Sequence, residues 1–166
     1  MRVVPNRMHC ADAAVYTERY PDLVVCCPAG AREQVEAVVP VDGLAWDVLG
    51  PHGITCHSPA GDDSFEHIYE LPLRDGAALI CADTVFHLRE HLPGFSGFIA
   101  RYITASTGFF GVTRLGRLFL WGKAGLLKEW LLEQADRDDL SAIVVGHGVP
   151  VTSDVPGHLR EAAARL

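Results

Sequence analysis

The chain has 166 residues, of which 49% are hydrophobic and 21% are charged, a composition that fits a folded globular protein and excludes a wholly disordered one. With 14 basic and 21 acidic residues, the formal net charge is −7, so the basic excess with which nucleic-acid-binding domains neutralise phosphates is missing. From the charge we expect no nucleic-acid partner, and from the length of the chain we expect a single domain over residues 1–166.

The chain contains five cysteines at irregular spacing: Cys10, Cys26, Cys27, Cys56 and Cys81. An odd count without a regular pattern argues against a secreted disulfide framework, so we expect free thiols. No apolar run approaches the roughly 20 residues of a membrane-spanning helix, and residues 1–9 lack the apolar core of a signal peptide. The sequence therefore predicts a cytoplasmic protein with no membrane partner.

Two strand–helix pairs are predicted near the start of the chain. Residues 2–5 are β-like and end in a turn, and residues 11–20 space their apolar side chains as a helix does. The apolar run at residues 22–27 is typical of a buried strand. Residues 31–39 carry the apolar stripe of an amphipathic helix.

The middle of the chain is predicted to be rich in strands. The four short candidates are residues 44–48, 53–57, 66–71 and 77–82. Asp75-Gly76 precedes the last of them and is typical of a hairpin turn. Residues 66–71 alternate between apolar and polar side chains, which favours a half-exposed strand.

Helices dominate the second half of the chain, with one further strand. Residues 98–103 form an apolar helical piece, and residues 125–135 have the clearest helical pattern. Residues 142–145 are typical of a buried strand, and residues 156–166 of a closing helix for which Asp154 is the expected N-cap.

This order of elements predicts the fold class. Helices interleaved with strands, with hairpins in the middle, are typical of a layered α/β fold with a mixed β-sheet. Three apolar runs are expected to be buried in its core: residues 24–26, 79–81 and 143–145.

Two of the predicted strands end in residues that can carry chemistry. Asp83 follows the run at residues 79–82, and His147 follows residues 143–145 and stands between Gly146 and Gly148. Ligands of α/β folds gather outside the carboxyl ends of strands, imidazole is the commonest metal ligand, and flanking glycines allow the backbone to approach a ligand closely. The alternative is structural: Asp83 caps the next turn, and His147 satisfies one.

A third cluster lies in the turn at residues 5–12. It offers His9 and Asp12, with Cys10 as a softer donor, and cations such as Zn²⁺ accept ligands of these kinds. Alternatively, Asp12 is a first-turn carboxylate favoured by the helix dipole and His9 is a loop residue. Phosphate-binding, dinucleotide-binding and serine-nucleophile motifs are absent from the sequence. The other histidines are weaker candidates: His57 after a strand, His87 near Asp83, and four expected at the surface or in loops, which are His52, His67, His91 and His158.

Taken in order, these segments resemble the metallo-β-lactamase-fold superfamily, in particular its poorly characterised lactamase-like hydrolase branches. Residues 79–83 resemble the strand that presents the bridging Asp, residues 144–148 resemble the closing strand with the last metal-binding His, and residues 5–12 resemble the place of the first ligand cluster. That cluster is His-x-His-x-Asp-His in the family, and of it only His9 and Asp12 remain here, at a different spacing.

The resemblance implies a shortened αββα layered fold of the metallo-β-lactamase type. It also implies a metal-dependent hydrolase of small molecules, with Zn²⁺ or another divalent metal held by His9, Asp12, Asp83 and His147, the last three being catalytic as well. The alternative is a degenerate, metal-free member that acts as a binding or scaffold domain, with a homodimer expected if a shortened sheet exposes its edge.

Overall fold

The computed structural model describes residues 1–61, 66–91, 93–104, 107–120 and 122–166. The chain divides into two units, Met1–Leu71 and Pro72–Leu166. The expectation of one domain over residues 1–166 stays a prediction.

Three short parallel strands form a sheet in the first unit. They are β1 (Arg2–Val3), β2 (Val25–Cys27) and β3 (Gly43–Leu44), and β2 lies in the centre. The backbone N–H of Val25 donates to the carboxylate of Asp42 over 2.7 Å, so a side chain as well as the ladder fixes the start of the central strand.

Helices connect these strands, because parallel neighbours require a crossover. α1 (Ala13–Arg19) joins β1 to β2, and the 3₁₀ turn η1 (Ala29–Ala31) followed by α2 (Arg32–Glu36) joins β2 to β3. Both predicted strand–helix pairs are confirmed, with helices shorter than the expected residues 11–20 and 31–39.

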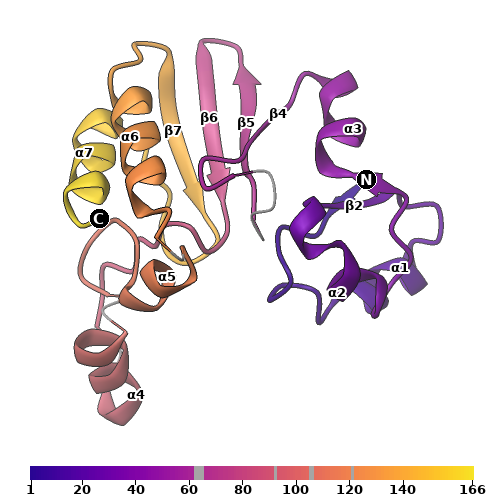
Figure 1. Ribbon diagram of the computed structural model, residues 1–166, viewed down its shortest axis with the longest axis horizontal. Helices are drawn as coiled ribbons and strands as arrows, with labels where there is room; N and C mark the ends of the chain where they lie inside the picture. Colours follow the sequence, from indigo (N-terminus) through magenta and orange to yellow (C-terminus); the bar gives the residue numbers. More distant parts are fainter. Residues whose placement is uncertain (62–65, 92, 105–106, 121) are drawn as a thin grey trace. The chain divides into compact units, whose positions relative to one another are not determined.

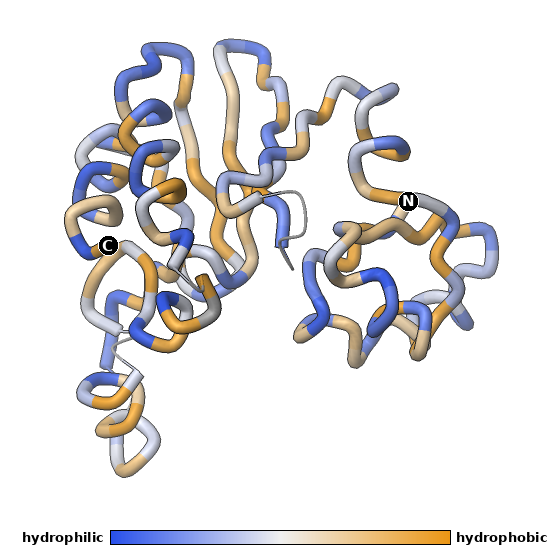
Figure 2. Tube along the Cα trace, viewed as in Figure 1, coloured by the Kyte–Doolittle hydropathy of each residue, from blue (hydrophilic) through white to orange (hydrophobic). Residues whose placement is uncertain are grey.

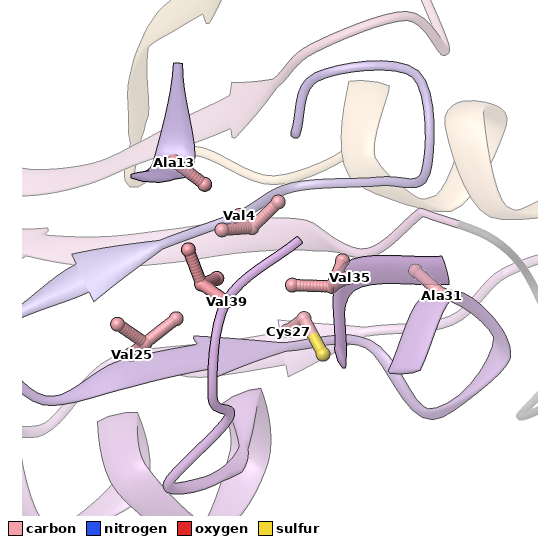
Figure 3. Packing of buried hydrophobic residues seen from close by; sticks show 7 residues of the cluster. All are labelled: Val4, Ala13, Val25, Cys27, Ala31, Val35 and Val39. Atoms are coloured by element: carbon pink, nitrogen blue, oxygen red, sulfur yellow. The ribbon is translucent and has the colours of Figure 1, made fainter. Parts of the chain in front are cut away.

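The core of the first unit consists of small and branched side chains (Figure 3). On β2 the alternation of a strand turns Val25 and Cys27 to this core and Cys26 to the opposite face. The helices α1 and α2 contribute one buried side chain each. The full cluster of buried residues is Val4, Ala13, Val25, Cys27, Ala31, Val35 and Val39.

The expected strand at residues 44–48 is wrong. Only Gly43–Leu44 is extended, and the chain then forms α3 (Ala45–Leu49), with Ala45 and Leu49 buried. A spacing of four residues puts two side chains on one face in a helix and also in a strand, so a short apolar run does not distinguish the two. The 3₁₀ turn η2 (Gly50–His52) follows, and Gly53 ends it in the left-handed region at φ 76°.

An antiparallel pair of strands completes the first unit. β4 (Thr55–His57) pairs with β5 (Ile68–Leu73), with Cys56 opposite Tyr69, and β5 continues past Leu71 into the second unit. The expected alternation over residues 66–71 is wrong, because Glu66, His67, Ile68 and Tyr69 are all buried.

The second unit is built on a parallel strand pair. β6 (Gly76–Cys81) begins after the turn at Arg74 and Asp75, and it runs parallel to β7 (Leu140–Val145). Parallel pairing here and antiparallel pairing of β4 with β5, interleaved with helices, confirm an α/β fold with mixed strand pairing.

Two long helices pack beside this strand pair. α6 (Ala124–Ala135) and α7 (Val155–Ala164) lie along each other, and α7 contacts β7 (Figure 1). The predicted N-cap of the last helix is confirmed, because the carboxylate of Asp154 accepts the backbone N–H of Gly157 over 3.2 Å.

Between β6 and α6 the chain forms shorter helical segments. These are α4 (Gly94–Phe98), the π-helical turn η3 (Ile99–Ile103) and α5 (Arg114–Phe119). In the described ranges, no helix combines the length and the apolar composition that crossing a membrane requires.

Burial of the three apolar runs follows strand alternation. Leu79 and Cys81 are buried, as are Ile143 and Val145. The expected burial is wrong at two positions. Val144 is 36% exposed because it points to the other face of β7, and Val24, one residue before β2, is 43% exposed.

All five cysteines have free thiols, as expected. Burial raises the pKa of the Cys26 thiol to about 11, and it raises that of Cys56 to about 11 as well. A shift of two units reduces the reactive thiolate at pH 8 by about 100-fold. Folding favours the protonated thiols, so their stabilising contribution is complete below pH 9 and is lost as the pH rises towards 11.

We therefore predict slow alkylation of native Cys26 and Cys56 by iodoacetamide at pH 8, about 100-fold slower than in urea-unfolded protein. Mass spectrometry of tryptic peptides at timed quenches measures each site, and the partly exposed Cys10 is the internal reference. Equal native rates at Cys26 and Cys10 would contradict the burial of β2.

Candidate functional site

Two parallel strand ends bring Asp83 and His147 together. In the β6–β7 ladder Cys81 is the partner of Val145, and each of the two functional residues stands two positions beyond its strand. Equal offsets from paired residues lead to the same edge of the sheet, and His147 Nε2 lies 2.9 Å from the Asp83 carboxylate. The prediction that these two side chains are neighbours is confirmed.

The glycines beside His147 have a packing role that the sequence interpretation missed. A Cβ on Gly146 would lie 3.0 Å from the Cα and carbonyl oxygen of Ala82, and one on Gly148 would fall on the backbone of His87. Gly148 also has φ 123°, a conformation that side chains disfavour. The close approach made possible by these glycines is therefore to the chain's own backbone.

Backbone hydrogen bonds hold the segment around His147 in place. The N–H of His87 donates to the carbonyl of His147 over 2.9 Å, and the N–H of Val149 donates to the carbonyl of His87 over 3.1 Å. The segment after β6 and the segment after β7 thus continue to pair beyond the two strands.

The imidazole of His147 is held by contacts to the face of its ring as well as to its edge. The ring of Phe86 stacks on it with centroids 4.6 Å apart and an interplanar angle of 7°. The His147 side chain is 38% exposed and that of Asp83 is 20% exposed. The pair is oriented by its neighbours and remains accessible to a small solute.

His87 supports this arrangement through two hydrogen bonds of its buried ring. Its Nδ1 donates to the carbonyl of Val149 over 2.7 Å, and its Nε2 accepts from Arg89 Nε over 3.2 Å. A carbonyl partner requires a proton on Nδ1, and an arginine N–H requires a lone pair on Nε2, so these contacts fix the tautomer. His87 therefore fastens the loop that carries Phe86.

In the first unit, Asn6 organises the turn that carries His9 and Asp12. The Asn6 side-chain oxygen accepts the backbone N–H groups of Met8 and His9 over 2.8 and 3.1 Å, and its amide donates to the Glu66 carboxylate over 3.0 Å. Asn6 is fully buried. Sequence reasoning predicted a turn at Pro5-Asn6, but it did not single out Asn6 as the residue that closes the turn or Glu66 as its partner.

The two predicted ligands on this turn differ in setting. His9 is partly buried, and Asp12 is exposed at the start of α1, where its side chain makes no capping hydrogen bond. His9, Asp83 and His147 each offer an atom that a metal ion can accept, an imidazole nitrogen or a carboxylate oxygen. Within one unit, the structure brings together Asp83 and His147. The roles of His9 and Asp12 as ligands stay predictions.

Two further histidines of the first unit, His57 and His67, have neighbours of their own. His67 was expected at the surface or in a loop; it lies just before β5, outside regular secondary structure, but it is fully buried and its ring stacks on Trp46 at 5.2 Å. Close by in sequence, His57 Nε2 lies 2.8 Å from the Glu70 carboxylate across the β4–β5 pair. Burial also raises the pKa of the Tyr69 hydroxyl. These contacts give His57 and His67 structural partners within the first unit.

Comparison with known proteins adds no family. No protein-family model matches the chain, and no curated protein sequence matches it. The resemblance to the metallo-β-lactamase-fold superfamily therefore stays a prediction that rests on the residues around His9, Asp83 and His147.

We predict that Gly148→Ala destabilises the protein by about 1–3 kcal/mol, because the alanine would be strained at its φ and would meet the backbone of His87. The measurement is thermal unfolding followed by circular dichroism, with a fall in Tm of several degrees expected. Gly125→Ala is the matched control, since nothing lies within 4 Å of its new Cβ and a helical alanine is favourable. Equal Tm values for the two variants would contradict the close approach.

Proposed function

We propose that the protein is a metal-dependent hydrolase of small molecules, with Asp83 and His147 among the metal ligands. The observation that carries the proposal is the 2.9 Å contact between a carboxylate and an imidazole at the carboxyl ends of two parallel strands. Strand ends of this kind are where α/β folds collect their ligands.

The donor set fits a borderline cation such as Zn²⁺. Imidazole nitrogen and carboxylate oxygen are both accepted by Zn²⁺, and the two atoms are near enough to be ligands of one ion. Both side chains are partly exposed, so an ion and a small substrate have access. His9 and Asp12 enter the proposal from the sequence as the further ligands.

The chain's own residues supply orientation and charge. The Asp83 carboxylate lies beside the imidazole nitrogen and adds a negative charge that favours a cation. Phe86 limits rotation of the His147 ring by stacking on it. A bound divalent ion supplies a water of lowered pKa and a polarised substrate bond. The net charge of −7 does not attract polyanions from a distance, which favours a small neutral or cationic substrate.

The metal-free alternative has an observation of its own. Asp83 and His147 satisfy each other directly, and the flanking glycines are explained by backbone packing. In that case the pair fastens β6 to β7, and the protein acts as a binding or scaffold domain.

Metal binding distinguishes the two functions. A ligand at 100 times its Kd stabilises the folded state by about 2.7 kcal/mol, so we predict a rise in Tm of several degrees with Zn²⁺ or Mn²⁺. His147→Ala and Asp83→Ala should each abolish the rise. His52→Ala, at an exposed histidine outside the predicted ligand set, is the control and should retain it.

The substitutions His9→Ala and Asp12→Ala test the further ligands separately. Loss of the thermal shift in either variant assigns that residue to the site, whereas an unchanged shift removes it. If elemental analysis of protein purified without chelator finds no metal and neither ion changes the wild-type Tm, the hydrolase proposal fails and the scaffold function takes its place.

A further inference from the structure

Positive charge is concentrated in one stretch of the second unit. Between Gly94 and Lys128 the sequence has five basic residues and no acidic residue, while the other 131 residues hold the remaining nine basic residues and all 21 acidic ones. The five are Arg101, Arg114, Arg117, Lys123 and Lys128. A chain with net charge −7 thus contains a local region of the opposite sign.

The same stretch exposes large apolar side chains. On the helical arm formed by α4 and η3, Phe95 is 78% exposed, and on α5 Leu118 is 71% exposed. The arm projects away from the β6–β7 pair of its own unit in Figure 1, and Figure 2 shows its hydrophobic residues. We call the exposed apolar side chains of the arm and α5, together with Arg101, Arg114 and Arg117, the apolar–basic face. Its apolar members are Phe95, Phe98, Tyr102, Ile103, Leu115 and Leu118.

The aromatic residues of the arm lie along one side of it. Phe95, Phe98 and Tyr102 are spaced by three and four residues, which places them on one helical face. The rings of Phe98 and Tyr102 have centroids 5.1 Å apart, and the guanidinium of Arg101 lies 5.2 Å from the Tyr102 ring. Charge and aromatic surface are therefore adjacent.

Arg114 joins the arm to α5. Its backbone N–H donates to the carbonyl of Thr104 over 2.9 Å, and its Nη1 donates to the carbonyl of Tyr102 over 2.9 Å. Thr113 caps α5 by accepting the N–H of Gly116. The end of the arm and the start of α5 are thus held together.

We propose that the apolar–basic face docks on the headgroup region of an anionic lipid bilayer. Phe, Tyr, Leu and Ile beside arginines, in a stretch whose sequence has no acidic residue, form the combination by which interfacial helices bind membranes. Basic residues near an anionic leaflet add electrostatic attraction. The inference goes beyond the proposed function. It concerns binding to the surface of a bilayer, whereas the prediction of no membrane partner rested on the absence of a run long enough to span one.

Charge argues against a second copy of the chain as the occupant. In a two-fold dimer the same patch meets itself, so the basic residues of one face would oppose those of the other. Like charges across an interface oppose association. An anionic lipid surface complements both the charge and the aromatic side chains.

The test is co-sedimentation with sucrose-loaded vesicles. We expect binding to vesicles of phosphatidylcholine with roughly 30% phosphatidylserine, an anionic lipid that attracts basic segments, and at least tenfold weaker binding to phosphatidylcholine alone. Binding should weaken as NaCl is raised from about 0.1 to 0.5 M, because salt screens exposed charges.

Two double variants separate the apolar and electrostatic contributions. Phe95→Ser with Phe98→Ser should abolish sedimentation, and Arg101→Glu with Arg117→Glu should reduce the partition coefficient by more than about 25-fold, at roughly fivefold for each cation removed. Leu132→Ser and Arg74→Glu, at exposed positions outside the face, are the matched controls and should bind like the wild type. Circular dichroism confirms the fold of each variant.

Three results would overturn the proposal. One is the absence of wild-type sedimentation with either vesicle. Another is binding that is equal for both vesicle compositions and insensitive to salt. The last is a dimer in light scattering that the Phe95→Ser and Phe98→Ser double variant dissociates, since the face would then be occupied by a second copy.

Discussion

The register of the parallel pair β6–β7 determines the candidate site. Pairing of Cys81 with Val145 sets the positions of the residues that follow, because each step beyond the strands advances both chains along the same edge. A shift of one residue on either strand would turn its side chains to the other face of the sheet and would separate Asp83 from His147. The stacking of Phe86, the buried His87 and the two glycines all depend on that register.

The proximity of Asp83 and His147 could be predicted from the sequence because it depends only on which strands are neighbours. An apolar run ending in Asp83 and another ending in His147 are sufficient if the two strands are parallel neighbours. The sequence could not explain the glycines, since a close backbone approach has the same pattern whether the neighbour is a ligand or the chain itself. The turn at Asn6 was predicted, but its contact with Glu66 was not, because Glu66 is 60 residues away in the sequence.

Short segments were the least predictable part of the fold. At residues 45–49 the apolar spacing fits a helix and a strand equally, and the structure has a helix that buries Ala45 and Leu49. His67 was expected at the surface or in a loop, and nothing in its sequence neighbourhood indicated that its ring is buried and stacks on Trp46. The exposure of Val144 on β7 was not predicted either, because in an all-apolar run the sequence does not show which side chain faces solvent.

The connection between β6 and β7 has a consequence for how the protein folds. The two strands are separated by the 58 residues between Cys81 and Leu140, so their pairing is non-local and the chain entropy of closing that loop must be overcome first. The turn around Asn6, by contrast, forms hydrogen bonds to Met8 and His9, two and three residues away. Local structure in the first unit is therefore expected to precede the strand pairing that assembles Asp83 and His147, and a chain still emerging from the ribosome lacks the pair until β7 has been synthesised.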